Sequence, residues 1–488
     1  MSDKPVRVRI APSPTGYFHI GSARTALFNW LFARHHGGAF IVRVQDTDRS
    51  RYNAEAVPDM IASLRWLGLD WDEGPKVGGD YGPYYQSERL DLYRRYANQL
   101  LAQGQAYKCY CSPQRLAALR EEQRRNKQDV GYDRHCRHLT AAQRAGYEAQ
   151  GISPVIRLKA PLEGQTSFRD VLYGAITVDN HTLDDLVLLK SDGFPTYHLG
   201  VVVDDHLMAI SHIMRGDEWL PSVPKHILLY QAFGWEPPVF AHLPLILAPT
   251  GKGKLSKRHG GVEIHEFRRQ GYLPEAMVNY LARLGWSYDD KTEIFSREEL
   301  IRYFDLPGVN NSPARLSYER LEWMNAYYIR HLAPDDLAQR LVPFMAQAGF
   351  EVTAADLLPI IPLIQERLKT LSQVVEWADF FFQPELAYEA ELLVGKKMTA
   401  AESLAALQRA GETLAALPDF CAEGMEAPLR DLATDLGLKA GQLFGIVRVA
   451  VTGKKVAPPL FGTMEVLGQE QSLARIDGAL ETLAGLAA

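Results

Sequence analysis

The chain has 488 residues, of which 47% are hydrophobic, and a formal net charge of −6. This length predicts roughly three to five domains, each with its own core. No apolar run is long enough to span a bilayer and the first residues, MSDKP, begin no signal peptide, so we expect a cytoplasmic protein that does not enter a membrane. The negative charge argues mildly against a nucleic-acid partner, although large enzymes contact RNA through local basic patches.

The first forty residues predict a strand, a sharp loop and a helix. Apolar residues alternate with arginines over 6–10, which is the period-two pattern of a strand. Apolar residues then recur at helical spacing over 23–31, until two glycines at 37–38. The loop between them, APSPTGYFHIGS, has two prolines and can continue neither element. A helix mouth behind such a loop favours an anion, because its N–H groups are unpaired and its dipole is positive there.

His19 lies at this helix mouth, and a lysine-rich loop, GKGKLSKRHG, occupies residues 251–260. Taken alone, each could be a plain connection or a solvated surface loop. Together, an imidazole and a multiply cationic loop suit a triphosphate that is held from two sides. The dinucleotide fingerprint GxGxxG and the phosphate loop GxxxxGK[ST] are absent here, so nicotinamide chemistry and P-loop hydrolysis lose their usual sequence support.

The four cysteines form no disulfide framework, because three of them cluster between residues 109 and 136. Cys109 and Cys111 are followed by Cys136 and His138. Two close pairs of ligands separated by a gap are typical of a tetrahedral structural zinc site. Three buried cysteines beside a surface histidine would give the same pattern.

The middle of the chain predicts further strands, and the last third predicts helices. Residues 182–189, the unbroken apolar run 199–203 and residues 208–214 each read as a strand, the second buried on both faces. Asp204, Asp205 and His206 follow that run, but three adjacent residues of an extended chain cannot all face one metal ion. Helical spacing predicts helices over 337–348, 354–382, 400–417, 430–449 and 472–486.

The two loops resemble the signature motifs of class I aminoacyl-tRNA synthetases. HIGS at 19–22 looks like their His-Ile-Gly-His motif, and KLSKR at 254–258 looks like Lys-Met-Ser-Lys-Ser, with substitutions that one subfamily tolerates. That subfamily is bacterial glutamyl-tRNA synthetase. The segments that are similar to it lie at 9–16, 45–48, 71–75, 197–206 and 215–218.

The resemblance implies an α/β fold: a Rossmann-type, doubly wound parallel sheet, split by an insertion and followed by an all-α anticodon-binding half. The expected parts are the first half of the catalytic domain (1–105), a connective insertion for zinc and the tRNA acceptor end (106–190), the second catalytic half with the lysine loop (191–260), a stem-contact domain (261–330) and a helical anticodon-binding region (331–488). Glutaminyl relatives have β-barrels in place of the last region, so the helical pattern favours the glutamyl enzymes.

The resemblance also implies a reaction, in which L-glutamate is activated by ATP with Mg²⁺ and transferred to tRNA(Glu). The expected catalytic residues are His19, Lys254 and Lys257. The expected ATP contacts are Thr15, Gly16, His19, Gly21, Glu218 and Lys257. The expected glutamate contacts are Arg9, Ala11, Ser13, Gln45, Tyr197 and Arg215. One structural Zn²⁺ is expected on Cys109, Cys111, Cys136 and His138.

The arginines and the glutamine among these glutamate contacts can also be interpreted from the chemistry of their side chains. Arg9 and Arg215 follow predicted strands, and a guanidinium forks onto a carboxylate with two parallel hydrogen bonds that a neutral amide cannot reproduce. Either arginine could instead be an ordinary ion pair. Gln45 departs from the family pattern, which usually has glutamate there, and offers a dipole to the substrate's ammonium group where a charge is expected.

A non-catalytic RNA-binding homologue and a nucleotidyltransferase of the same superfold remain alternative functions for the chain. We expect the protein to be a monomer.

Overall fold

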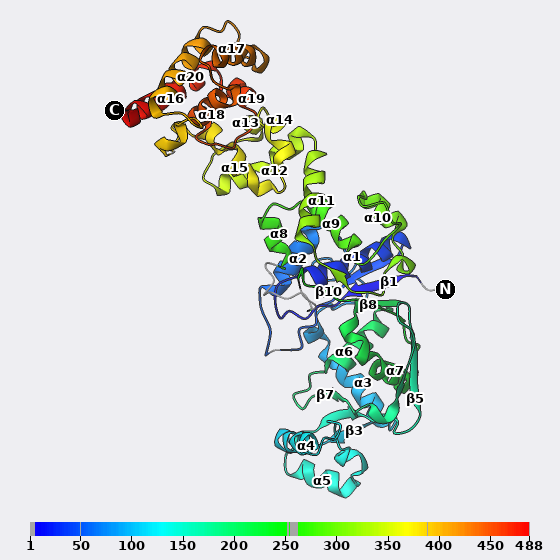
Figure 1. Ribbon diagram of the computed structural model, residues 1–488. Coiled ribbons are helices and arrows are strands. Elements are labelled where there is room, and N and C mark those ends of the chain that lie inside the picture. The colour runs from blue at the N-terminus through cyan, green and yellow to red at the C-terminus, as the bar shows by residue number, and fades with distance from the viewer. Residues whose placement is uncertain (1–4, 49, 251–252, 254–261, 388, 488) are drawn as a thin grey trace. The chain divides into compact units, whose positions relative to one another are not determined.

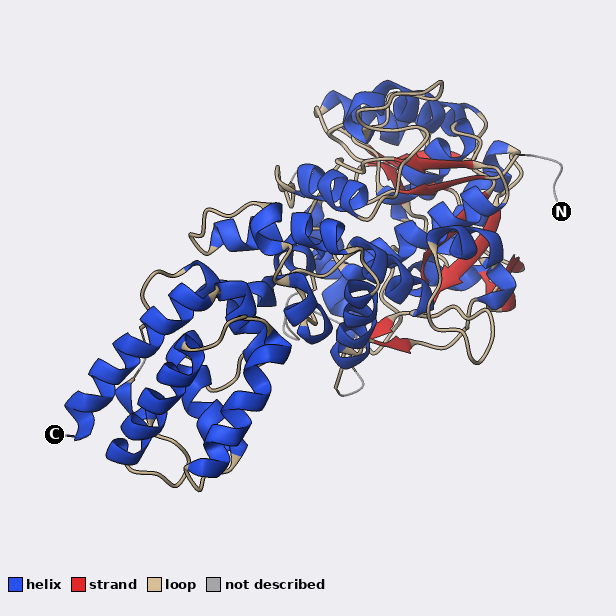
Figure 2. Cartoon of the chain, turned by 90° about the horizontal axis from the view of Figure 1, so that it is seen from above, coloured by secondary structure: helices blue, strands red, loops and turns tan. Residues whose placement is uncertain are grey.

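The computed structural model describes residues 5–48, 50–250, 253, 262–387 and 389–487 (Figure 1). The chain divides into two compact units. The first comprises Met1–Phe267 with Met277–Tyr318, and the second comprises Arg268–Ala276 with Glu319–Ala488. All strands of the described residues belong to the first unit, and the second is helical (Figure 2).

The first unit is built on parallel strands, as the sequence predicts. β1 (Arg7–Ile10) pairs in parallel with β2 (Ala39–Val42), and α1 (Ile20–His35) connects them. β8 (His212–Gly216) pairs in parallel with β9 (Val239–Leu243). The N–H of Ser211 donates to the carbonyl of Arg7 at 2.9 Å, which places this second pair beside β1. The arrangement confirms the Rossmann-type sheet.

The segment between the two catalytic halves contributes to two sheets. One is an antiparallel sheet of β3 (Ala106–Cys109), β4 (Val155–Leu158) and β7 (Val187–Leu189), and the same segment contains α4 (Pro113–Arg125) and α5 (Ala141–Ala149). The hairpin of β5 (Gln165–Asp170) and β6 (Gly174–Asp179) instead joins the catalytic sheet, in the order β6-β5-β9-β8. Part of the expected insertion therefore extends the catalytic sheet.

The apolar run 199–203 lies in a helix, so the strand expected there is wrong. α6 (Tyr197–Leu207) begins after Thr196, whose backbone is extended, and each of its residues over 199–205 is buried. A continuous apolar run fits a helix that is buried on all sides as well as a strand, and periodicity cannot separate the two. The strand expected over 208–214 begins only at His212, after Ala209 turns the backbone with a φ of 53°.

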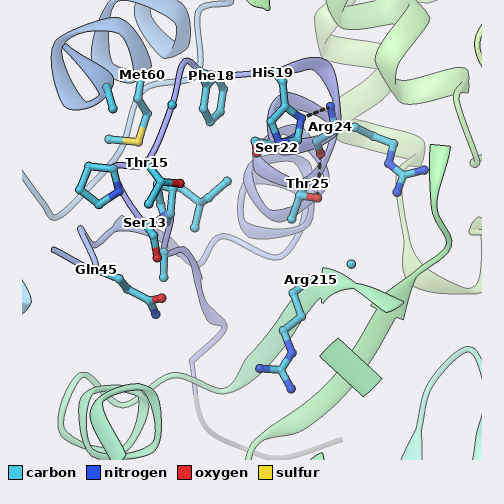
Figure 3. Close-up of a pocket in the computed structure, with 18 of the residues that line it drawn as sticks. Ser13, Thr15, Phe18, His19, Ser22, Arg24, Thr25, Gln45, Met60 and Arg215 are labelled. Carbon is cyan, nitrogen blue, oxygen red and sulfur yellow. Dashed lines mark hydrogen bonds between the residues drawn. The ribbon is translucent and has the colours of Figure 1, made fainter. Parts of the chain in front are cut away.

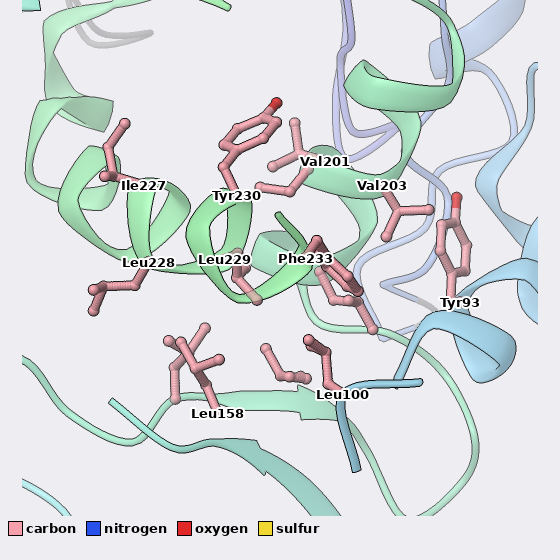
Figure 4. Packing of buried hydrophobic residues seen from close by; sticks show 14 of the residues in the cluster. Tyr93, Leu100, Leu158, Val201, Val203, Ile227, Leu228, Leu229, Tyr230 and Phe233 are labelled. Carbon is pink, nitrogen blue, oxygen red and sulfur yellow. The ribbon is translucent and has the colours of Figure 1, made fainter. Parts of the chain in front are cut away.

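α6 packs between α3 (Leu90–Ala102) and α7 (Val223–Phe233), and this packing makes the core of the catalytic half (Figure 4). The cluster also includes side chains of β4, so it joins the insertion to the catalytic sheet. Its labelled members are Tyr93, Leu100, Leu158, Val201, Val203, Ile227, Leu228, Leu229, Tyr230 and Phe233. α7 ends at Gly234, whose φ of 70° suits a left-handed helix cap.

The remaining helices and strands begin in the first unit or in the 268–276 segment of the second, and three of the helices have residues in both units. They are α2 (Ala56–Trp66), β10 (Ile246–Leu247), α8 (Ile264–Arg269), α9 (Pro274–Arg283), α10 (Arg297–Tyr303), β11 (Ala314–Arg315) and α11 (Tyr318–Arg330). No helix within the described part of the chain is both long and apolar enough to cross a membrane.

The second unit confirms the all-helical C-terminal half but corrects two of the expected helices. The segment 354–382 is broken into short pieces, and the first break is near Pro359 and Pro362, which cannot donate the helical hydrogen bonds. The helix expected over 430–449 is two helices, separated at Gly437 with a φ of 69°. The helices are α12 (Pro334–Gln347), α13 (Ala354–Leu357), α14 (Ile361–Ile364), α15 (Val374–Ala378), α16 (Ala400–Ala415), α17 (Ala422–Asp435), α18 (Ala440–Thr452), α19 (Leu460–Leu467) and α20 (Gln469–Ala487).

Two aspartates in the last turn of α6 hold a buried network of arginines. Asp205 accepts hydrogen bonds from Nε and Nη2 of Arg9 at 3.0 and 3.1 Å, and it pairs with Nη1 of Arg43 at 2.9 Å. Asp204 accepts from Nε of Arg89 at 2.8 Å. Burial alone would raise the pKa of Asp205, but the charges of Arg9 and Arg43 outweigh it and lower that pKa below its ordinary value. These aspartates are therefore partners of arginines.

This network predicts a large stability effect. Asp205→Asn should lower the free energy of unfolding of the first unit by about 3–5 kcal/mol, because it leaves two buried guanidinium groups short of a charge partner. Urea unfolding followed by tryptophan fluorescence measures it. The control is Asp192→Asn, which removes an exposed ion pair of 3.7 Å with Lys190 and should cost less than about 1 kcal/mol. Equal midpoints for the two variants would contradict the account.

Candidate active site

A cavity of about 570 Å³ opens at the carboxyl ends of β1 and β8, above the first turn of α1 (Figure 3). Ligands of open α/β sheets gather at this edge. The cavity is lined by every described residue that the sequence assigned to ATP or glutamate. These are Arg9, Ala11, Ser13, Thr15, Gly16, His19, Gly21, Gln45, Tyr197, Arg215 and Glu218. Lys254 and Lys257 lie outside the described residues.

His19 is the N-cap of α1, and its ring covers the mouth of the helix. Nδ1 accepts hydrogen bonds from the backbone N–H groups of Gly21 at 3.1 Å and Ser22 at 3.4 Å. Because Nδ1 accepts, the proton of the neutral ring is on Nε2, which lies 3.1 Å from Oγ of Ser22. A side chain on Gly21 would place its Cβ 3.1 Å from this ring, so glycine allows the ring its position. The His19 ring and the positive end of the α1 dipole therefore lie together at the cavity.

The mouth of α1 is tied to the residues that follow the lysine-rich loop. The N–H of Ile20 donates to the carbonyl of Val262 at 2.8 Å, and the N–H of Ile264 donates to the carbonyl of Phe18 at 2.9 Å. His19 and Glu263 form an antiparallel bridge between these bonds. Ile246, before the loop, and Val262, after it, both line the cavity. Described residues on either side of the loop therefore lie at the cavity that His19 faces.

Arg9 reaches the cavity as part of an ion pair. Its side chain is 4% exposed, and Asp205 holds both Nε and Nη2. Nη1 makes no hydrogen bond to any described residue. Most of its positive charge is balanced by Asp205, which is itself shared with Arg43. Arg9 can therefore offer a ligand one N–H-bearing nitrogen.

Arg215 is held only by neutral groups. Nε donates to Nε2 of His242 at 3.0 Å, Nη1 donates to Oη of Tyr197 at 2.7 Å, and Nη2 contacts the carbonyl of Trp219 at 3.4 Å. Among the described residues, no carboxylate forms an ion pair with it. Burial lowers the pKa of Arg215, as expected for a cation that is removed from water without a counter-charge. The cavity thus contains an uncompensated guanidinium that can bind a carboxylate.

Arg24 is a cavity residue that the sequence analysis missed. Its side chain is 4% exposed, and it donates to the backbone carbonyls of Pro244 and Leu284. Burial lowers the pKa of Arg24 to about 10, although Asp217 and Glu218 oppose this. The available signal was an arginine on the buried, otherwise apolar face of α1, which needs partners from elsewhere in the fold.

The cysteine cluster lies in the insertion, away from β1 and α1 in the chain. The Sγ atoms of Cys109, Cys111 and Cys136 all lie within 4.8 Å of one another. A hydrogen bond from Cys136 and a smaller contribution from Tyr132 outweigh burial and lower the pKa of Cys109 to about 4. Three close sulfurs, one of them readily ionised, fit a zinc ion as ligands.

The structure does not bring His138 into this group. His138 is exposed, whereas the hydroxyl of Tyr132 lies 3.3 Å from Sγ of Cys109 and 3.6 Å from Sγ of Cys111. The same hydroxyl accepts the N–H of Cys136 at 2.9 Å. The sequence analysis overlooked Tyr132, because a tyrosine between cysteines is usually a core residue.

Comparison with known proteins gives the class first. The family model described as "tRNA synthetases class I (E and Q), catalytic domain" matches residues 5–323, and the one described as "Anticodon binding domain" matches residues 336–480. Together they span both halves of the chain, as the sheet with its cavity and the helical second unit would require.

Curated relatives make the class more specific. A glutamate–tRNA ligase of Dehalococcoides mccartyi (strain BAV1) is 54% identical over 483 residues, covering 98% of each chain. One of Roseiflexus castenholzii is 49% identical over 491 residues, covering 98% of this chain and 97% of the relative. A solved glutamate–tRNA ligase of Elizabethkingia meningosepticum, crystallised with its amino acid, has a TM-score of 0.89 at 37% identity and covers 98% of this chain and 100% of its own. The chain belongs to the glutamate–tRNA ligase family of class I tRNA synthetases.

Proposed function

We propose that the chain is a glutamate–tRNA ligase, which uses ATP to activate L-glutamate and transfers it to the 3′ end of tRNA(Glu) for protein synthesis. The observation that carries this proposal is the uncompensated Arg215 in the same cavity as the histidine-capped mouth of α1. A cation without a carboxylate partner fits an anionic side chain, and a helix mouth fits a phosphate. The relatives named above support the same substrates.

The first step needs little side-chain chemistry. An oxygen of the glutamate α-carboxylate attacks the α-phosphorus of ATP in line, and pyrophosphate leaves. Catalysis is positioning together with stabilisation of the negative charge that develops on the phosphate. The His19 ring and the positive end of the α1 dipole take one side, and Lys254 and Lys257 take the other. Mg²⁺ arrives with ATP and neutralises phosphate charge.

In the second step a ribose hydroxyl of the terminal adenosine of tRNA attacks the carbonyl carbon of the mixed anhydride. The ester to tRNA forms and AMP leaves, with the hydroxyl proton going to the departing phosphate or to solvent. The adenylate stays bound meanwhile through Arg215 at its side chain and through the helix mouth at its phosphate. The enzyme therefore needs no covalent intermediate of its own.

Selection of glutamate over glutamine follows from the same contacts. The γ-carboxylate accepts from Arg215 and from the free nitrogen of Arg9, while the neutral amide of glutamine would leave the buried Arg215 uncompensated. A site built on polar pairing rejects an analogue that lacks the partner by roughly 10⁴-fold. Gln45, which is 7% exposed in the cavity, offers its amide oxygen to the ammonium group.

We further propose one structural Zn²⁺, held by Cys109, Cys111 and Cys136, with His138 or Tyr132 as the fourth group. Zinc bound there would cross-link β3 to the turn His135–His138 and stabilise the insertion. It would lie apart from the reaction. The protein would act as a cytoplasmic monomer.

Charging assays test the proposed function. The purified protein, ATP and L-glutamate should esterify tRNA(Glu), and L-glutamine should not substitute for L-glutamate. Parallel reactions with purified tRNA(Gln) establish whether that tRNA is also a substrate. If pyrophosphate exchange and charging with glutamate are both absent, the chain is a non-catalytic RNA-binding homologue. Adenylyl transfer to an acceptor other than tRNA would instead favour the nucleotidyltransferase.

Metal analysis tests the zinc proposal. Protein purified without chelator should hold about one zinc per chain by atomic absorption, and Cys136→Ser should lose it. Cys421→Ser is the matched control, because Cys421 caps α17 in the second unit and should leave the zinc content unchanged. Comparison of His138→Ala with Tyr132→Phe identifies the fourth group. Wild-type protein that contains no zinc would refute the site.

A further inference from the structure

The buried groups behind Arg215 have no role in the reaction described above. His242, in β9, is fully buried, and its Nε2 accepts the hydrogen bond from Nε of Arg215. Its Nδ1 lies 2.7 Å from Oδ2 of Asp170, at the end of β5. Asp170 is 1% exposed, so a carboxylate, an imidazole and a guanidinium follow one another in the protein interior. Of these three residues, Arg215 lines the cavity (Figure 3).

The hydrogen bonds fix which nitrogen of His242 carries the proton. A carboxylate only accepts, so Nδ1 of His242 must be the donor to Asp170, and Nε2 then has the lone pair that accepts from Arg215. Burial, and less strongly the charge of Arg215, lower the pKa of His242, while the bond to Asp170 opposes them. The ring is therefore neutral, with its lone pair directed at Arg215.

Asp170 is itself held in one orientation. Its Oδ1 accepts from the N–H groups of Leu172 at 2.9 Å and Tyr173 at 3.1 Å, in the turn of the β5–β6 hairpin. Its Oδ2 accepts from the backbone N–H of His242 at 3.2 Å. Both oxygens are thus occupied, and the carboxylate cannot turn away from the ring.

This arrangement differs from that of Arg9 in its electrostatic consequence. Asp205 touches Arg9 directly and neutralises it, so that a ligand must compete with a resident carboxylate. The imidazole between Asp170 and Arg215 fixes the edge of the guanidinium without giving it a counter-charge. Orientation and charge are thereby separated: the plane of Arg215 is fixed, and its charge stays available.

We propose that Asp170 and His242 are positioning residues that hold the Arg215 guanidinium in the plane that pairs with the side-chain carboxylate of glutamate. This inference rests on the proposed function. It makes a residue of the β5–β6 hairpin, outside the cavity, a determinant of amino-acid affinity. The effect acts on glutamate and not on ATP, because ATP is held at the mouth of α1.

Asp170→Asn tests it with little change of volume. The amide oxygen is expected at the Oδ1 position, where it accepts two backbone N–H groups, whereas only one backbone N–H group, that of His242, points at Oδ2. The NH₂ group then faces Nδ1 of His242. Nδ1 of His242 then has to accept a hydrogen bond from this NH₂ group, so the ring proton moves to Nε2. There it faces the N–H at Nε of Arg215, and the hydrogen bond between the two side chains is lost. We expect the KM for glutamate in pyrophosphate exchange to rise about 10-fold or more, with the KM for ATP within about 2-fold of wild type.

The control and the histidine variants sharpen the test. Asp179→Asn, on the exposed end of the same hairpin, removes only the charge of a carboxylate that accepts from Gln165, and it should leave both KM values unchanged. His242→Gln can place its amide oxygen near the Nε2 position, whereas His242→Asn can only replace Nδ1. His242→Gln should therefore keep a lower KM for glutamate. A merely structural role would raise both KM values and lower the melting temperature equally in the two histidine variants, and this result would overturn the proposal.

A readout that does not depend on activity keeps this test separate from the test of the proposed function. ¹⁵N spectra of histidine-labelled protein, with the His242 signals assigned by their loss in His242→Gln, should show the proton on Nδ1 in wild type and on Nε2 in Asp170→Asn. The same tautomer in both proteins would overturn the inference. Absence of glutamate-dependent exchange in the wild type would instead overturn the proposed function.

Discussion

The active-site cavity depends on a short stretch of backbone pairing between residues 18–20 and 262–264. Two hydrogen bonds of 2.8 and 2.9 Å and the bridge between His19 and Glu263 join the mouth of α1 to the segment that follows the lysine-rich loop. A pairing so distant in sequence costs loop-closure entropy, and the buried contacts of Ile20, Val262 and Ile264 offset it. It fixes residues 262–264, which follow the loop, beside the imidazole that caps the helix.

The amino-acid side of the cavity depends on how two buried cations are balanced. Arg9 is paired with Asp205, which stabilises the carboxyl end of β1 and leaves only one nitrogen for a ligand. Arg215 is held by a tyrosine hydroxyl, an imidazole and a carbonyl, so none of the groups that bind it neutralises its positive charge. The fold tolerates this unbalanced cation because the substrate brings the missing carboxylate. Arg9 therefore contributes mainly to the stability of the fold, and Arg215 contributes mainly to the affinity for glutamate.

Local patterns predicted much of this structure. Alternation over 6–10 and the proline-rich loop predicted β1 and the mouth of α1, and the cavity residues followed from a resemblance that the comparisons confirm at the level of the family. A strand was wrongly predicted for residues 199–203 of α6, because five apolar residues, three of them valines, fit a buried helix and a buried strand equally well. The sequence analysis rejected a metal cluster at Asp204, Asp205 and His206, but it did not predict that the two aspartates are partners of buried arginines.

The other differences arise from contacts between distant residues. Asp170 and His242 are separated by a long stretch of chain and meet only because β5 pairs with β9. No local sequence pattern predicts this strand pairing. The spacing of the cysteines suggested His138 as the fourth metal ligand, but the turn that brings Cys136 to the other sulfurs leaves His138 exposed. Spacing limits which residues can meet, whereas the tertiary fold decides which of them do.

The central claim is that His19 and Lys257 act on one triphosphate from two sides. A double-mutant cycle of His19→Ala and Lys257→Ala, measured by ATP–pyrophosphate exchange with tRNA present, tests it most directly. Each single variant should lose about 100-fold in rate, and the double variant should lose at least about tenfold less than the product of the two losses, because groups that stabilise the same charge act as a unit. Strictly multiplicative losses, or near-normal exchange by Lys257→Ala, would contradict the account.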